Sequence, residues 1–149
     1  MTISRLALAA ALLSAAPAIA GTTYDAVDPM IGTGGGGHTY PGATAPFGMV
    51  QLSPDTDTSC EIRACYAHAA GYQYGDPTIQ GFSHTHFSGA GHSDLGDFLV
   101  MPVSGDTIPL EPGDPARPGS GYRSRFDHKS EVAHPGYYAV TLSDAHVRA

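Results

Sequence analysis

The sequence predicts an all-β fold, an antiparallel β-sandwich, and three observations favour it. Apolar segments are short and are separated by Gly, Pro, Ser and Asp, as in strands joined by turns. Helical periodicity is nearly absent: after residue 20, the longest stretch without Gly or Pro, residues 55–70, shows no helical repeat of apolar residues. Several segments alternate between apolar and polar residues, which is typical of strands with one buried face.

The expected strands follow one another between turn-forming segments, at residues 49–53, 71–74, 78–86, 97–103, 121–127 and 137–142. The last of them shows the alternation plainly, because Tyr138, Val140 and Leu142 would share one face of the strand. Residues 109–120 are rich in Pro and Gly and predict a loop. Residues 145–149 resemble the beginning of a further strand, so we expect a truncated product.

Residues 1–20 are predicted to be a secretory signal peptide. Arg5 precedes an apolar run at residues 6–13, and Ala18-Ile19-Ala20 provides the small residues of a cleavage site. The apolar run is shorter than the roughly 20 residues that a membrane-spanning helix needs. We therefore expect cleavage near Ala20, a secreted or periplasmic product without a membrane partner, and one β-sandwich domain over residues 21–149 that is incomplete at its C-terminus.

Charge and cysteine content limit the classes of partner. The formal net charge is -7, and the basic residues nearest to a cluster, Arg123, Arg125 and Lys129, are interrupted by an aspartate. Nucleic-acid binding needs clustered Lys and Arg, so we expect no nucleic-acid partner. Cys60 and Cys65 would meet an oxidising compartment after export, where a disulfide closing this short loop would stabilise the fold by about 2–3 kcal/mol. The sequence leaves open whether that disulfide forms, and the spacing does not match a two-cysteine metal site.

The segment at residues 81–97 has the composition of a binding site. Three imidazoles and two carboxylates lie there among small residues: His84, His86, His92, Asp94 and Asp97. His84 and His86 are two apart on an expected strand, so both would point to the same face and suit either metal chelation or one polar ligand. A metal site would also need a ligand from His92, Asp94 or Asp97. A buried polar network is the competing interpretation, above all for Asp97.

The glycine run at residues 32–37 has the letters of a dinucleotide-binding motif without its context. Residues 38–42 follow it and cannot begin a helix, and no Gly-Lys-Ser/Thr follows, so neither a dinucleotide site nor a P-loop is predicted. The glycine run would instead form a flexible backbone that closely approaches either a ligand or a neighbouring segment, and a purely conformational role stays open. No catalytic residue is predicted: the sequence lacks a Gly-x-Ser-x-Gly elbow, and Asp94 and Asp97 are too close in sequence to set a glycosidase acid–base separation.

Six segments resemble, in order, the N-terminal β-sandwich domain of glycoside hydrolase family 92. They lie at residues 27–34, 38–56, 71–72, 79–86, 96–102 and 126–138, and the fourth contains the words Gly81-Phe82-Ser83-His84-Thr85-His86. One departure stands out, because family members commonly read Gly-Cys-Gly-Asp where this chain reads Gly91-His92-Ser93-Asp94. The resemblance covers nearly all of the sequence that follows the predicted signal peptide.

The resemblance implies a part of an enzyme. Family members are secreted or periplasmic, calcium-dependent, inverting exo-α-mannosidases in which the β-sandwich packs on an (α/α)6-barrel, and the barrel carries the general acid, the general base and most calcium contacts. This chain would then be inactive alone and would need the missing barrel as a partner. It would form one wall of a pocket for an α-mannoside or a mannose-containing glycan. The implied substrate-binding residues are His84, His86, Asp94, His38, Gly36, Gly37 and, as an apolar platform, Tyr72.

Two other functions stay open at this point. The chain could be a stand-alone carbohydrate-binding module without hydrolytic activity. It could also be a periplasmic metal-binding protein that uses the His84-x-His86 pair.

Overall fold

The computed structural model describes residues 22–44, 47–58, 64–92, 96 and 98–149, and all strand pairs in this part are antiparallel. The predicted fold class, an antiparallel all-β sandwich, is confirmed. Helical structure in the described residues is limited to one α-helical turn, α2 (Ala64–Ala67), and one 3₁₀ turn, η1 (His128–Ser130). Residues 1–21 lie outside this part, so the signal peptide stays a prediction.

The largest described sheet has three strands in the order β1-β3-β4. Its members are β1 (Ser53–Asp55), β3 (Gly81–Ser83) and β4 (Leu99–Val100). In the register of this sheet Ser53 lies opposite Ser83, and Phe82 lies opposite Val100. The side chains of Ser53, Asp55 and Ser83 are buried, so this sheet directs polar groups inward.

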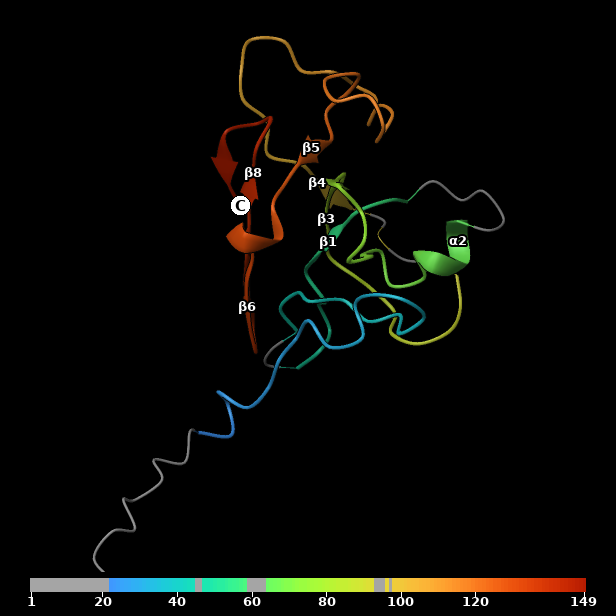
Figure 1. The fold of residues 1–149 in the computed structure, drawn as a ribbon, viewed down its shortest axis with the longest axis vertical. Helices are drawn as coiled ribbons and strands as arrows, with labels where there is room; N and C mark the ends of the chain where they lie inside the picture. The colour runs from blue at the N-terminus through green and yellow to red at the C-terminus, as the bar shows by residue number, and fades with distance from the viewer. Residues whose placement is uncertain (1–21, 45–46, 59–63, 93–95, 97) are drawn as a thin grey trace, which may run out of the picture.

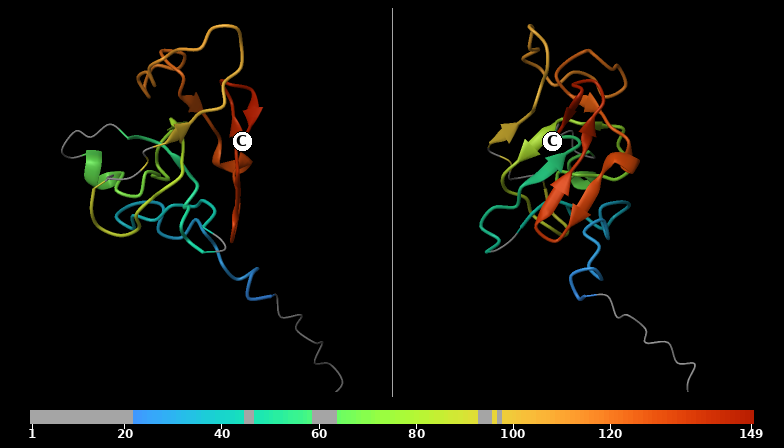
Figure 2. Two further views of the ribbon diagram at one scale, coloured as in Figure 1. Left: turned by 180° about the vertical axis from the view of Figure 1, so that it is seen from behind. Right: turned by 90° about the vertical axis from the view of Figure 1, so that its left-hand side faces the viewer.

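Three two-stranded sheets complete the described strands. They pair β2 (Thr78–Ile79) with β5 (Ser124–Arg125), β6 (Val132–His134) with β7 (Tyr137–Ala139), and β8 (Thr141–Leu142) with β9 (Val147–Arg148). The C-terminal hairpins and helix α2 lie on opposite sides of the β1–β3–β4 sheet (Figures 1 and 2).

The core is small, and three of its four buried residues come from the C-terminal segment, residues 140–145. Ile79, Val140, Leu142 and Ala145 are buried together. Partly buried side chains pack against them: Phe82, Met101, Phe126, Tyr138, Val147 and Ala149. Much of the remaining interior is polar, including Asp55 and His86, so hydrogen bonds must satisfy these groups.

The predicted strands lie close to observed ones, with five corrections. The strand predicted at residues 137–142 is two strands, β7 and β8, which belong to different sheets. Residues 71–74 form no strand, because Gly71 takes a left-handed φ of 77°. Residues 78–86 split into β2 and β3, and the latter ends at Ser83. Strand β1 begins where the strand predicted at residues 49–53 ends, and β6 was not predicted.

The expected faces of residues 137–142 are largely confirmed. Val140 and Leu142 are fully buried and Tyr138 is half-buried, whereas Thr141 is exposed. Ala139 departs from the alternation because it is buried as well. The predicted loop at residues 109–120 contains neither a strand nor a helix, and β9 lies where the beginning of a strand was expected.

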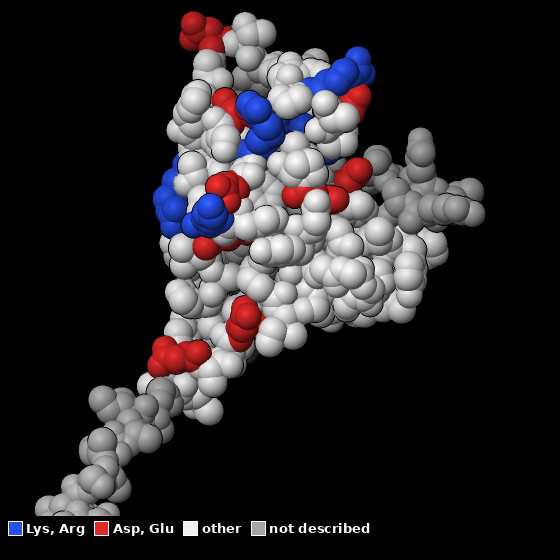
Figure 3. All heavy atoms as spheres, viewed as in Figure 1, with Lys and Arg blue, Asp and Glu red and all other residues white. Residues whose placement is uncertain are grey.

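The described surface mixes both charge signs. On the face drawn in Figure 3, basic side chains lie among acidic ones in the upper part. No helix among the described residues has the length and apolarity that a membrane span requires.

Candidate functional site

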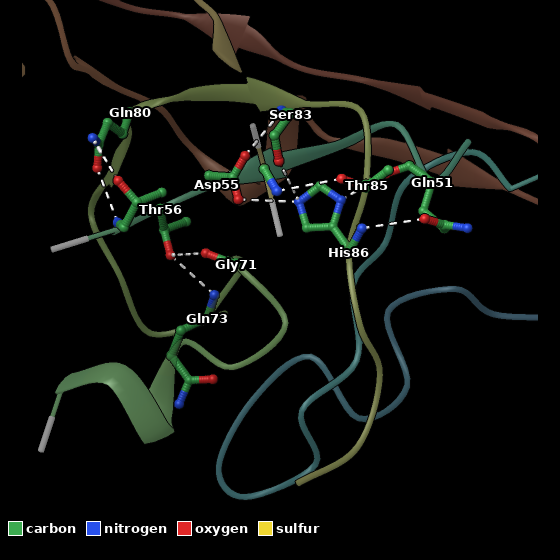
Figure 4. A network of polar contacts seen from close by, with 11 residues as sticks. Gln51, Asp55, Thr56, Gly71, Gln73, Gln80, Ser83, Thr85 and His86 are labelled. Carbon is green, nitrogen blue, oxygen red and sulfur yellow. Dashed lines mark hydrogen bonds and ion pairs between the residues drawn. The ribbon is translucent and has the colours of Figure 1, made fainter. Parts of the chain in front are cut away.

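The His86 network is a buried cluster of polar side chains between β1 and the end of β3 (Figure 4). His86 Nε2 lies 3.0 Å from Asp55 Oδ1 and 3.0 Å from Ser83 Oγ. On the other side of the ring, Nδ1 lies 2.6 Å from the backbone carbonyl oxygen of Gln51. The second carboxylate oxygen of Asp55 accepts from the Ser83 backbone N–H over 2.9 Å.

The partners of His86 determine how many protons the network holds. A backbone carbonyl only accepts, so Nδ1 carries a proton and donates it to Gln51. The contact between Nε2 and the Asp55 carboxylate needs a second proton. The His86 and Asp55 side chains, 2% and 4% exposed, therefore form a buried, proton-sharing ion pair.

This geometry suits structural support better than nucleophilic catalysis. In a Ser-His-Asp triad the serine and the carboxylate contact opposite ring nitrogens, whereas Ser83 and Asp55 both contact Nε2. The adjoining cavity, lined by Gly71 and Thr85 among others, has a volume of about 20 Å³, which holds about one water molecule and no sugar ring. His86 also keeps no free ring nitrogen for a metal ion.

The expected common face of His84 and His86 is wrong. The pairing of Ser53 with Ser83 would place Thr85 opposite Gln51, yet the Gln51 backbone N–H donates to the His84 carbonyl. The pairing therefore shifts by one residue after β3, as at a β-bulge, and the two-residue alternation is lost. His86 turns into the network, whereas His84 stays half-buried outside it.

The side chain of His84 lies beside an exposed aromatic ring. Its ring centroid is 5.2 Å from that of Phe98, which is 73% exposed. Nδ1 of His84 is buried without a partner, whereas Nε2 is neither buried nor hydrogen-bonded to a described residue. An accessible hydrogen-bonding nitrogen beside an apolar ring is the combination that sugar rings require. The sequence reasoning missed Phe98, although the strand predicted at residues 97–103 contains it.

The glycine loop is positioned mainly by its own backbone. A side chain at Gly37 would collide with the Gly32 carbonyl oxygen, whereas nothing lies within 4 Å of a Cβ at Gly36. His38 is 6% exposed, has a left-handed φ of 50°, and keeps both ring nitrogens buried without a partner. The centroid of its ring lies 4.5 Å from the centroid of the Tyr66 ring. Gly36, like Gly35 before it, is thus an open position of the loop, and a ligand role for Gly36, Gly37 and His38 stays a prediction.

Tyr72 is not a surface platform. Its side chain is 1% exposed, and its hydroxyl donates to Glu131 Oε1 over 2.9 Å. Asp94, Asp97 and Cys60 lie outside the described residues, so the predicted role of Asp94 and the Cys60–Cys65 disulfide stay predictions.

A second carboxylate–histidine cluster surrounds Glu131, and the sequence reasoning assigned it no role. The Tyr72 and Tyr138 hydroxyls both donate to Oε1, and His128 Nδ1 lies 2.5 Å from Oε2. Burial, and next the negative charge of Glu131, raise the pKa of Tyr72 and Tyr138 far above the ordinary value. The three-residue spacing of His128 and Glu131 around a polar turn is the signal that could have found this cluster.

Comparisons with known proteins place these features in context. Residues 26–149 match the glycosyl hydrolase family 92 N-terminal domain. An uncharacterized secreted glycosidase of Arthroderma benhamiae is 31% identical over 122 residues, which is 79% of this chain. A family GH92 α-mannosidase of Bacteroides thetaiotaomicron, solved in complex with mannoimidazole, is 51% identical with a TM-score of 0.77 over 85% of this chain.

A second solved relative is more distant. The family GH92 inverting mannosidase of the same bacterium is 26% identical, with a TM-score of 0.57 over 84% of this chain. The chain spans only a small part of each relative, namely 14% of the fungal glycosidase and 16% of each Bacteroides enzyme.

Proposed function

Because the chain belongs to glycoside hydrolase family 92 as part of its N-terminal domain, we propose that it forms a non-catalytic wall of an α-mannoside pocket in an inverting exo-α-mannosidase. One observation carries the proposal: the accessible Nε2 of His84 lies beside the exposed ring of Phe98. The similarity to an α-mannosidase solved with mannoimidazole supports mannose as the sugar.

In this proposal Phe98 and His84 make different kinds of contact with the sugar. Phe98 would cover the C–H face of a pyranose ring, and His84 Nε2 would hydrogen-bond one of its hydroxyls. The His86 network would hold the backbone beneath them, because His86 is two residues from His84 and is bonded to β1 through Asp55. Gly36 and Asp94 are further candidate contacts. The general acid and general base would come from the rest of the longer enzyme.

Calcium and export belong to the proposal as well. The described residues contain no group of three or more His, Cys, Asp or Glu side chains that could hold a metal ion, and no step proposed here uses calcium. We place the calcium of the family enzyme mostly outside this chain. The kinship with a glycosidase described as secreted supports a secreted or periplasmic location after cleavage near Ala20.

Saturation-transfer NMR of the chain with methyl α-mannopyranoside tests the wall. We expect weak binding to the wild type, a loss in both His84→Ala and Phe98→Ala, and no change in the control His92→Ala, which alters an exposed histidine. Binding that persists in both His84→Ala and Phe98→Ala, or no binding by the wild type, would contradict the proposed mannose wall. Hydrolysis of an aryl α-mannoside by this chain would contradict its non-catalytic character. Stoichiometric zinc binding that His84→Ala removes would favour the metal-binding alternative instead.

A further inference from the structure

A pocket of about 400 Å³ lies beside β6 and reaches the Glu131 cluster. Tyr74, His128, Glu131 and His134 form its polar side, and Met30 and Val132 are among the apolar side chains that line it. None of the predicted substrate-binding residues lines this pocket, so it is separate from the proposed mannose wall.

Glu131 is held by three donors and is 5% exposed. Its Oε1 accepts from the Tyr138 hydroxyl over 2.6 Å and from the Tyr72 hydroxyl over 2.9 Å. Its Oε2 faces His128 Nδ1. A carboxylate that is bonded in this way is fixed in place and has little capacity left to bind a cation. Tyr72, Tyr138 and Glu131 therefore act as positioning residues for His128.

The Glu131 carboxylate also fixes the proton of the imidazole. Because Oε2 accepts, His128 carries a proton on Nδ1, which leaves a lone pair on Nε2 in the neutral form of the ring. This nitrogen is neither buried nor hydrogen-bonded to a described residue. The imidazole plane is set by stacking on Tyr74, with ring centroids 4.0 Å apart and planes at 14°. In its neutral form His128 thus offers an oriented hydrogen-bond acceptor in a pocket.

The other residues of the pocket narrow the chemical class of its ligand. Neither Lys nor Arg lines it among the described residues, so no permanently charged cation is available to hold an anion, and the basic side chains of the lining are the imidazoles of His128 and His134. The apolar side chains and the ring of Tyr74, which remains 45% exposed, favour a ligand with C–H faces. In the neutral form of His128, Nε2 needs a donor, which a hydroxyl group provides.

We propose that this pocket is a second saccharide site, in which His128 is neutral, its Nε2 accepts a hydrogen bond from a ligand hydroxyl, and Tyr74 borders the sugar ring. The site takes a neutral hexopyranoside, and its volume accommodates a small sugar rather than a long chain.

Long-range ¹⁵N NMR of the histidine rings in the whole chain tests the site, with methyl hexopyranosides of the manno, gluco and galacto series as probes. We expect the His128 signals to show the Nδ1–H tautomer and the Nε2 signal to move on addition of at least one sugar. A different tautomer, or an Nε2 signal that none of the three sugars moves, would overturn the proposal.

Two substitutions distinguish the contribution of His128 Nε2 to binding from an effect of the substitution on folding. In His128→Asn the side-chain amide can still donate to Glu131 but nothing replaces Nε2, whereas in His128→Phe the ring on Tyr74 is kept without either nitrogen. Loss of one hydrogen bond predicts binding about fivefold weaker in both variants. Unchanged affinity in His128→Asn would overturn the site even if His128→Phe fails to fold.

Further variants keep this site and the mannose wall distinguishable. His84→Ala should leave the His128 shifts unchanged, and His128→Asn should leave binding at the His84–Phe98 wall unchanged. The control His146→Asn replaces an exposed histidine with a left-handed φ of 53°, which Asn tolerates, and should change neither.

Discussion

His86 and His128 both contact a carboxylate, yet only His128 keeps a ring nitrogen free. In the His86 network Nδ1 is hydrogen-bonded to the backbone carbonyl of Gln51, and Nε2 is hydrogen-bonded to Asp55. In the Glu131 cluster the carboxylate takes Nδ1, and Nε2 is accessible. A histidine with two internal partners supports the fold, whereas one with a single partner is oriented for a ligand.

The largest expected difference between the two clusters concerns stability. His86→Ala leaves the buried Asp55 carboxylate unpaired and should lower the free energy of unfolding by about 3–5 kcal/mol. His128→Ala should cost about half as much, because its side chain is 33% exposed and two tyrosine hydroxyls still bond Glu131. Urea unfolding followed by circular dichroism measures both. Equal losses would erase the distinction between the two histidines.

A glycine substitution tests how rigid the His86 network is. A methyl group at Gly71 would collide with Asp55 Oδ1 and lie 2.8 Å from His86 Cδ2, and the residue also has a φ of 77°. Gly71→Ala should therefore destabilise by about 3 kcal/mol, combining the left-handed cost with the displaced ion pair. Gly35→Ala is the matched control, because its φ of 61° is similar but nothing lies within 4 Å. Gly35→Ala should lower the free energy of unfolding by only about 1 kcal/mol in the same experiment. Similar losses in both variants would show that the His86 network rearranges at little cost.

The Glu131 cluster should respond less to the loss of one donor. Tyr138→Phe removes the 2.6 Å hydrogen bond to Glu131 and should lower the free energy of unfolding by about 2 kcal/mol, as expected for a bond to a charged group. Tyr137→Phe is the control, because that side chain is 50% exposed and should change stability by less than about 0.5 kcal/mol. Thermal or urea unfolding compares the two variants. Equal effects would show that the hydrogen bond from Tyr138 to Glu131 does not stabilise the fold.

Sequence patterns located the strands better than they located the side chains. Gly and Pro spacing was enough to place β4 and β5, because turns break the chain whatever the tertiary contacts. The alternation of His84 and His86 failed because a one-residue shift after Ser83 depends on Gln51, a residue far away in sequence.

Tyr72 was misplaced for a similar reason. Its partner, Glu131, is 59 residues away along the chain, and no local pattern encodes their meeting. The types of residue at a site could thus be predicted, whereas the number of partners of each side chain required the fold.

The smallest expected effect concerns alkaline pH and belongs to Tyr72 and Tyr138. Burial, and next the charge of Glu131, raise the pKa of both phenols above the unfolded value of about 10. A raised pKa means that the folded state keeps protons that the unfolded state releases, so stability is fully present below pH 10 and falls as pH rises through it. Between pH 9 and pH 10 the two residues together should cost about 0.7 kcal/mol. Urea unfolding at both values should show this slope in the wild type and lose it in Tyr72→Phe/Tyr138→Phe, whereas a slope that persists would assign it to other groups.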